Sequence, residues 1–415
     1  MSFAWHHSIY MVSDLPAIQI SLYLVHIALA FFFMIGRGLP WITVILWFFQ
    51  VSLRNRNFSI TDGGDDIAVI LLFISIFLPL KKLPINAEAA KVETRFTKIW
   101  NALWSMVFTV QLLSMYFFSA LKKTDVSWKS SFTATALSLR LDNIASSFGH
   151  ALLHFPTLLK ASTAIVFNLE FFGPLIFLGC YLLPLSFTPR LKKIICILFM
   201  LLHVSILAIF RLWSFPLMCI TAWIALYPSS DTEIDTEEKN DEPTPVNLEE
   251  IQEESHPFDH LGEKMSYAFL LFPVLILLTI LDWNRLEVDS RYAMPEITHF
   301  TGQQLSLWQN WGMFAPYPTL NNNHFKFIGT KNDGSEVEVF NESQWLENRH
   351  RVKFLLNIAT TDNVYVGGLA RYYCKKNPAL TKLRIDAHNS IINKETLAVK
   401  EEDTTIWNQD CTATK

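Results

Sequence analysis

Long apolar runs, separated by short polar segments, dominate the first 285 residues of the chain. A helix needs about 20 apolar residues to cross a hydrocarbon core of about 30 Å, and several of the runs are shorter than that. The segments 40–53 and 67–80 are the weakest, and a re-entrant or buried helix is the alternative for each. We predict an all-α polytopic membrane helix bundle of about eight spans, at residues 17–36, 40–53, 67–80, 99–121, 161–184, 194–210, 212–227 and 266–281.

The pattern changes after residue 285. Two short alternating runs, 325–330 and 335–340, flank the turn sequence Lys331-Asn-Asp-Gly334, and this arrangement predicts a β-hairpin. Helical patterns follow at roughly 343–358 and 363–376. We therefore predict a small C-terminal α+β extramembrane domain that contains a β-hairpin.

Ahead of the hairpin, apolar residues recur at every third position, at Leu305, Trp308, Trp311 and Phe314, with glutamine and asparagine between them. This spacing predicts a short helix that lies in the headgroup region, with its tryptophans at the membrane interface.

The chain thus divides into an N-terminal segment (1–16), a transmembrane domain (17–285), a small C-terminal domain (286–377) and a tail (378–415) whose last 20 residues we expect to be frayed. Within the transmembrane domain, residues 229–259 hold 12 acidic residues, one lysine and three prolines. Such a segment buries too little apolar surface to offset its chain entropy, so we predict a disordered, solvated loop.

The composition agrees with this organisation. Hydrophobic residues make up 51% of the chain and charged residues only 17%, and there are 33 phenylalanines and 13 tryptophans. These values are typical of a multipass membrane protein, whose partner is the lipid bilayer. The net charge of −4 comes from the acidic loop, and no feature of the sequence indicates binding to nucleic acid. The N-terminus has no signal-peptide pattern, so we expect the first span to direct membrane insertion.

The five cysteines do not form a disulfide framework. Cys180, Cys196 and Cys219 lie within apolar runs, where a buried thiol behaves as a small hydrophobic group. Cys374 and Cys411 lie outside the runs, and their spacing does not decide whether they form a bond.

Two ionisable residues lie near mid-depth of consecutive predicted spans: Glu170 in 161–184 and His203 in 194–210. Each is costly in hydrocarbon, so each must face the bundle interior, a partner or a cavity. With a rise of about 1.5 Å per residue from their common loop, the two groups lie within about 8 Å of each other in depth. We predict a hydrogen-bonded Glu170–His203 pair; the alternative is a polar clamp that performs no chemistry.

Other charged residues lie at the ends of the runs. The sequence Asp62-Gly-Gly-Asp-Asp66 precedes an apolar run, and a capped helix start is favoured over a metal site because no histidine or cysteine lies beside it. Arg211 and the pair Lys122–Lys123 lie at span ends, where such residues usually anchor a helix in the headgroups. If every predicted span crosses the membrane, these groups and the C-terminal tail share one face.

Several landmarks, taken in order, resemble a known family. They are Ser59–Asp66 followed by Phe77-Leu-Pro79, Tyr116–Trp128, Ser147–Pro156, Asn168-Leu-Glu170 with Gly173-Pro174, Arg211–Pro216 and Trp308–Pro318. Their order and spacing are similar to those of the HTTM (horizontally transferred transmembrane) domain family, the bacterial relatives of the vitamin-K-dependent gamma-carboxylase. The resemblance covers about residues 17–377.

The resemblance implies lysine-based chemistry within a membrane helix bundle. Lys123 matches the lysine that acts as a base on vitamin K hydroquinone in the carboxylase, and Glu170 and His203 match polar positions of the family's membrane core. The large lumenal domain that captures substrate propeptides has no counterpart here, and the stretch Asp62–Asp66 replaces a histidine-bearing segment. Gamma-carboxylation of protein glutamate is therefore disfavoured, whereas a quinol remains the cofactor or substrate that this lysine implies.

Two hypotheses of function follow. In the first, the chain is an enzyme of the bacterial cytoplasmic membrane in which Lys123 acts as a general base on a quinol or another lipid-soluble substrate, because burial favours the uncharged amine of a lysine. Glu170 and His203 would complete its catalytic residues. In the second, the chain is a non-catalytic transporter-like or assembly component, in which ionisable residues brace the helices.

The first hypothesis makes a structural prediction. A cavity lined by Lys123 should open to the shared face, with Glu170 and His203 deeper and the Trp308–Pro318 segment across its rim. Three further charged residues of that face are its candidate substrate-binding groups: Lys122, Arg211 and Asp66.

Overall fold

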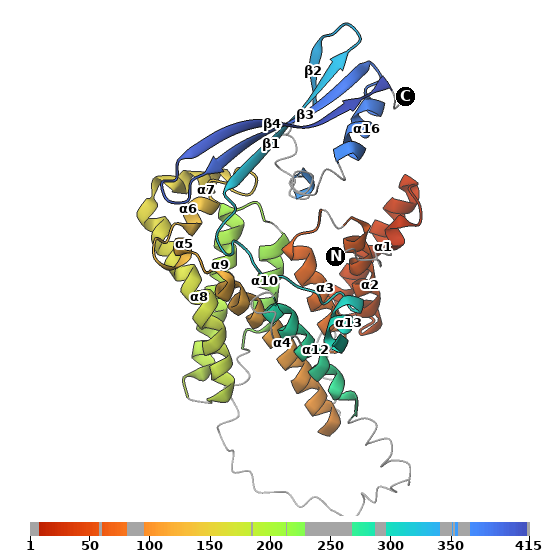
Figure 1. Cartoon of the computed structure of the whole chain (residues 1–415). Helices are drawn as coiled ribbons and strands as arrows, with labels where there is room; N and C mark the ends of the chain where they lie inside the picture. The colour runs from red at the N-terminus through yellow and green to blue at the C-terminus, as the bar shows by residue number, and fades with distance from the viewer. Residues whose placement is uncertain are drawn as a thin grey trace, which may run out of the picture.

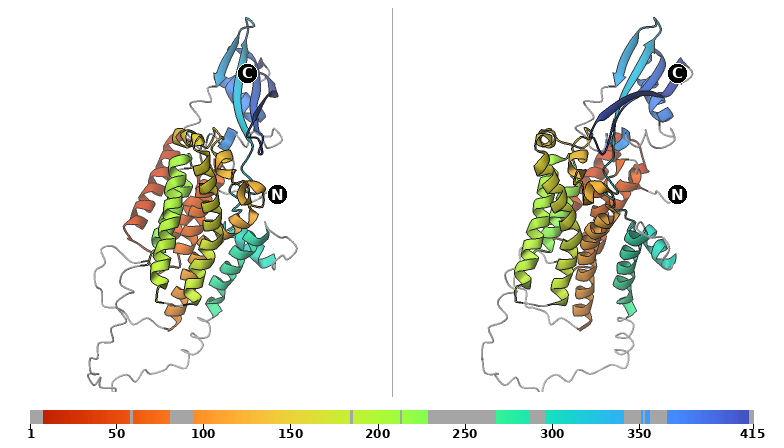
Figure 2. Two further views of the ribbon diagram at one scale, coloured as in Figure 1. Left: turned by 90° about the vertical axis from the view of Figure 1, so that its left-hand side faces the viewer. Right: turned by 60° about the vertical axis from the view of Figure 1, so that its left-hand side comes forward.

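The computed structural model describes residues 8–57, 60–80, 95–183, 186–212, 214–228, 268–286, 296–340, 351, 353–355 and 366–412. Figure 1 shows a bundle of helices with a four-stranded sheet at one end. The sheet extends beyond that end of the bundle in the two further views of Figure 2. The predicted acidic loop and most of the predicted helix 343–358 lie outside the described residues.

A helix is present at each of the eight predicted apolar segments. These helices are α1 (Pro16–Met34), α2 (Trp41–Arg56), α3 (Gly63–Ser75), α4 (Arg95–Lys122), α8 (Pro156–Leu182), α9 (Thr188–Ile209), α10 (Ser214–Ala225) and α12 (Leu271–Leu286). Among the described helices, α1, α4, α8 and α9 are long and apolar enough to cross a membrane by themselves, whereas α10 and α12 are apolar but shorter. The chain is therefore a membrane protein with four candidate spans, and eight full spans stay a prediction.

Helix α4 lies at the centre of the bundle, where it contacts α3, α8 and α12. Of its most apolar window 61% is buried, compared with 6% for α1. The polar face of α4 explains the difference, because Gln111, Ser114 and Ser119 are buried and a helix with such residues must face protein rather than lipid. Next to this face, the rings of Phe199 and Trp223 stack 4.4 Å apart.

The start of α3 confirms the capped-helix interpretation. The Asp62 side chain accepts from Gly64 N at 2.8 Å, and the Asp65 carboxylate accepts from Asp62 N at 2.9 Å, which makes a capping box. Gly64 is required by packing, because a Cβ at that position would clash with Ser214 Oγ on α10. The turn thus joins two helices, and Ser214 Oγ donates to Asp62.

The interfacial helix predicted at Leu305–Phe314 is wrong. Helix α13 (Glu296–Gln304) ends before it, and the chain then follows an irregular path against the bundle. Trp311 is 2% exposed and Gln309 is fully buried, and two hydrogen bonds of 2.8 Å join the Gln309 and Gln111 amides. A buried amide pair of this kind is satisfied only inside the bundle, so the segment packs into the protein and does not lie flat on the membrane.

The C-terminal sheet has the strand order β2-β1-β3-β4, and every pairing is antiparallel. Its strands are β1 (Asn321–Lys331), β2 (Glu336–Phe340), β3 (Leu380–Ile392) and β4 (Val399–Asp410). The predicted hairpin is confirmed as β1–β2. The prediction that the last 20 residues are frayed is wrong, because β4 occupies most of them. Strand β4 is polar and mostly exposed, which suits an edge strand that solvent reaches on several sides, and this composition hides it in the sequence.

Helix α16 (Val366–Lys376) packs against the sheet and confirms the helical pattern at 363–376 within the described residues. Its Ala370 and Tyr373 share a core with Phe325 and Leu383 of the strands. A disulfide joins Cys374 of α16 to Cys411 just after β4. Cys180, Cys196 and Cys219, in the apolar helices, are buried and free, as expected.

Candidate functional site

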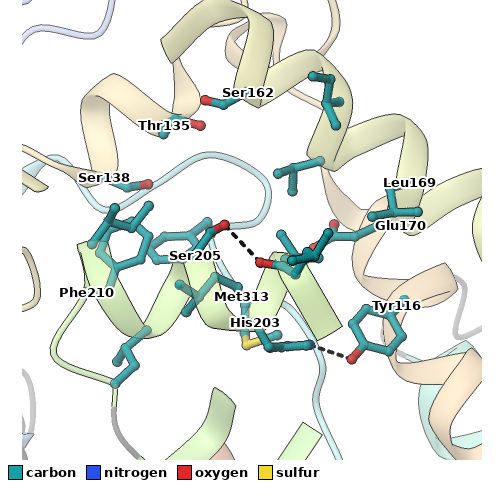
Figure 3. A pocket seen from close by; sticks show the side chains of 18 of the residues that line it. Tyr116, Thr135, Ser138, Ser162, Leu169, Glu170, His203, Ser205, Phe210 and Met313 are labelled. Atoms are coloured by element: carbon teal, nitrogen blue, oxygen red, sulfur yellow. Dashed lines mark hydrogen bonds between the residues drawn. The ribbon is translucent and has the colours of Figure 1, made fainter. Parts of the chain in front are cut away.

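A cavity of about 320 Å³ lies between the sheet-side end of α4 and helices α8 and α9. Its walls are mostly aliphatic and aromatic, and Lys123, Glu170 and His203 are among its few polar residues. Figure 3 shows Glu170, His203 and Tyr116 converging on this space from three helices. Met313 and Phe314, from the irregular segment before β1, also line it, so the cavity contains the predicted residues.

Lys123 and Glu170 form a buried ion pair in the wall of the cavity, which joins the end of α4 to α8. Lys123 is 1% exposed and Glu170 is 6% exposed. The ammonium also lies 4.3 Å from the centre of the Trp128 ring, which adds a cation–π contact. A buried charge is tolerated because a partner of opposite charge lies beside it, and removing one member leaves the other uncompensated.

The two adjacent lysines have different environments. Lys122 Nζ lies outside the cavity and donates to Asn310 Oδ1 at 3.0 Å in an exposed contact. Successive side chains along a helix point about 100° apart, so only one lysine of the pair faces the interior of the bundle. The structure places Lys123 there.

His203 pairs with α4 rather than with Glu170. Its Nε2 lies 2.5 Å from the Tyr116 hydroxyl, and Trp223 Nε1 donates to the same hydroxyl at 3.0 Å. The predicted direct Glu170–His203 hydrogen bond is therefore wrong, because each group has a partner on α4. Both side chains nevertheless line one cavity, as their common depth predicts.

Sequence reasoning missed Tyr116 and Trp128 as members of the site. Tyr116, Ser119 and Lys123 recur at i, i+3 and i+7, which places them on one face of a helix, so the signal for Tyr116 was present. Trp128 lies in the short helix α5 (Val126–Lys129) after α4, and its Nε1 donates to the Phe314 carbonyl at 2.9 Å. That long-range bond leaves no trace in the local sequence.

The other three candidate residues do not line this cavity. Asp66 forms an ion pair with Arg54 of α2 at 2.8 Å. Arg211 lies near Asp142, in the loop between α6 (Ala134–Ser138) and α7 (Ser147–Ala151). A hydrogen bond from His324 of β1, with nearby His150 and Arg211, lowers the pKa of Asp142. The proposed substrate-binding role of Lys122, Arg211 and Asp66 in the lysine cavity is thus not supported by their positions.

The cavity opens between α8 and α9. Three of its lining residues are also well exposed on the outer surface of these helices: Ile165 at 65%, Leu198 at 43% and Leu201 at 55%. An apolar, laterally open cavity fits an uncharged, lipid-soluble molecule. Among the described residues, no group of three or more histidine, cysteine or acidic side chains is arranged to hold a metal ion.

Comparisons with protein-family models, with curated proteins and with solved structures gave no match for this chain.

Proposed function

We propose that the chain is a multipass protein of the bacterial cytoplasmic membrane in which Lys123 acts as a general base on a hydroquinone or another lipid-soluble substrate. The observation that carries this proposal is the buried Lys123–Glu170 pair inside an apolar cavity that opens between α8 and α9. The ordered landmarks that resemble the HTTM family support the same lysine.

The chemistry needs a free amine, and Glu170 supplies a way to make one. Transfer of the shared proton from Lys123 to Glu170 leaves a carboxylic acid and a neutral amine that can act as a base. The amine then accepts the proton of a substrate hydroxyl as the O–H bond breaks. The resulting ammonium stands beside the new phenolate and stabilises its charge.

Tyr116 and His203 have a supporting role in this proposal. Their hydrogen bond ties α4 to α9, and the bond from Trp223 ties α4 to α10. These contacts fix the face of α4 that presents Lys123. A group that is held by packing and by hydrogen bonds loses little freedom on reaction, which favours catalysis.

The second candidate function is a non-catalytic brace within a transporter-like or assembly component. The observation that favours it is that Lys123 and Glu170 satisfy each other and join α4 to α8. The two functions differ in their tolerance of arginine. Lys123→Arg keeps a cation beside Glu170 but removes the base, because the guanidinium does not lose its proton at accessible pH. A brace therefore retains function in this variant, and a general base does not.

A crosslinking experiment tests the site. The purified chain in phosphatidylcholine nanodiscs is exposed to a long-chain alkyl hydroquinone that carries a diazirine, and labelled peptides are identified. We expect labelling of α8 and α9 around Ile165 and Leu201 that excess unlabelled hydroquinone removes. Leu201→Trp should block it, whereas Leu182→Trp, at the far end of α8 and 74% exposed, should not. Labelling that is spread evenly over lipid-facing residues and resists competition would contradict the site.

A further inference from the structure

A second, larger hollow of about 590 Å³ lies between the bundle and the sheet. Four asparagines contribute to its wall: Asn143 from the loop before α7, Asn310 from the irregular segment, and Asn321 and Asn323 from β1. Tyr317 adds a hydroxyl and a ring face, and it is 38% exposed. We call this hollow the amide chamber.

The hydrogen-bonding groups of the amide chamber are mainly neutral. Three charged residues also line the chamber: Asp62, Asp66 and Lys353. Each already has a protein partner, because Asp62 accepts from Gly64 N and Ser214 Oγ, Asp66 is paired with Arg54, and Lys353 is not free. An asparagine side chain offers two donors and an acceptor on one planar group. Several such groups around one space match a ligand that both donates and accepts hydrogen bonds and carries no net charge, as hydroxyl groups do.

One lining residue has unused hydrogen-bonding capacity. Asn143 is 9% exposed, and its Oδ1 makes no hydrogen bond to any described residue. Buried polar atoms are rarely left without a partner, and those that are call for an explanation such as a ligand or water. Because Asn143 lies in the wall of the chamber, the simplest explanation is that its Oδ1 accepts a hydrogen bond from a bound polar group.

The amide chamber adjoins the lysine cavity. The two share Leu212, Phe215, Met313 and Phe314 as lining residues, so a thin wall separates them. Phe314 has a φ of 57°, which is unusual for a bulky side chain and marks a backbone that its surroundings hold in place. The hydrogen bond from Trp128 Nε1 to the Phe314 carbonyl helps to fix this backbone conformation. Trp128 also contacts Lys123.

We propose that the amide chamber is a second ligand site that binds a neutral, hydroxyl-rich group such as a sugar. This group has two sources, a free sugar or the headgroup of a lipid whose apolar part reaches the neighbouring cavity. The proposal does not rest on the role of Lys123 as a base.

Native mass spectrometry of the full chain in phosphatidylcholine nanodiscs tests the proposal, with glucosyl-diacylglycerol, diacylglycerol and phosphatidylglycerol as probes. Calorimetry measures whether free glucose binds to the same chain. We expect glucosyl-diacylglycerol to be retained about tenfold more than the other two lipids, as one or two good hydrogen bonds allow. Binding of glucose without retention of the glucolipid would assign the site to a free sugar.

Matched variants locate the binding. Asn321→Ala and Asn323→Ala should each reduce it several-fold, and both leave the backbone pairing of β1 intact. The control is Asn389→Ala. Asn389 pairs with Asn323 on the adjacent strand β3 but does not line the chamber. The proposal is overturned if neither glucose nor the glucolipid binds, if phosphatidylglycerol binds as well as the glucolipid, or if Asn389→Ala has the same effect as Asn321→Ala.

Discussion

The two hollows of this molecule are neighbours that differ in their polar groups. The lysine cavity lies among α4, α8 and α9, has apolar walls and holds a compensated ion pair. The amide chamber lies between the bundle and the sheet, and its polar wall comes from a loop, an irregular segment and a strand. Met313 and Phe314 belong to both. A lipid-soluble group and a polar group can therefore approach one point from two directions.

The sequence is more informative about the lysine cavity than about the amide chamber. Ionisable residues within long apolar runs stand out because hydrocarbon does not tolerate them, so the sequence alone makes Glu170 and His203 candidates. Lys123 lies at the end of a run and is a candidate through the family resemblance. Asparagines in polar loops do not stand out. Asn143 and Asn321 are far apart in the chain and meet only because the sheet docks on the bundle.

The largest effect on stability should follow from removing one charge of the Lys123–Glu170 pair. Glu170→Ala leaves the Lys123 ammonium buried without its partner, and we expect a loss of about 3–5 kcal/mol in the free energy of unfolding. Thermal unfolding of the purified chain in detergent measures it. The double variant Glu170→Ala/Lys123→Met should recover most of the loss, because no charge stays buried. A double variant less stable than Glu170→Ala would contradict the pairing.

A second effect concerns the sheet. Replacing Cys374 and Cys411 by serine should destabilise the sheet and α16 by about 2–4 kcal/mol, because the bond limits the freedom of the unfolded chain. Limited proteolysis should then cut β4 faster while the bundle keeps its resistance. Equal loss of resistance in the bundle would show that the two regions unfold together.

The same disulfide predicts the orientation of the protein. Disulfides persist in oxidising compartments, so we expect the sheet and the amide chamber to face the non-cytoplasmic side. Cys374 and Cys411 are buried, so the test uses a cysteine introduced at an exposed position of β4, Glu401→Cys. A membrane-impermeant maleimide should label this cysteine in intact cells, and the buried thiols Cys180, Cys196 and Cys219 serve as unlabelled controls. Labelling that needs broken cells would reverse the orientation.

The smallest effect should be a pH dependence of the contact between sheet and bundle. The pKa of Asp142 lies below its ordinary value of 3.8, because of the hydrogen bond from His324 and the nearby His150 and Arg211. A lowered pKa stabilises the fold above pH 3.8, and this contribution is lost as the pH falls through the lowered pKa. Proteolysis at the start of β1 should therefore increase below about pH 4. The Asp142→Asn variant should lack this change.

Much of the bundle follows from the sequence. The apolar runs give the positions of the helices, and Asp62–Asp66 gives the start of α3. The length of the runs does not decide which helices cross a membrane alone, because α10 and α12 are short and packed among others. The hairpin also follows, because the turn between β1 and β2 has a strong local signal.

Other features depend on contacts that the sequence does not encode locally. Strand β4 is polar because it lies at an edge, so its composition resembles that of a tail. The Trp311 segment has the spacing of a helix, but hydrogen bonds from Gln111 and Asn284 to Gln309 Oε1 hold it in an irregular form. Glu170 and His203 do not pair with each other, because Glu170 contacts Lys123 and His203 contacts Tyr116.

The central claim is that Lys123 exchanges a proton with a lipid-soluble hydroxyl in the cavity. The most direct test titrates a long-chain alkyl nitrophenol, whose anion absorbs visible light, bound to the chain in nanodiscs. The account predicts that the unchanged chain and Lys122→Met lower the apparent pKa of the bound phenol, because the Lys123 ammonium stabilises the phenolate. Lys123→Met should abolish this shift. An equal shift in Lys122→Met and Lys123→Met would contradict the claim and leave Lys123 as a structural brace.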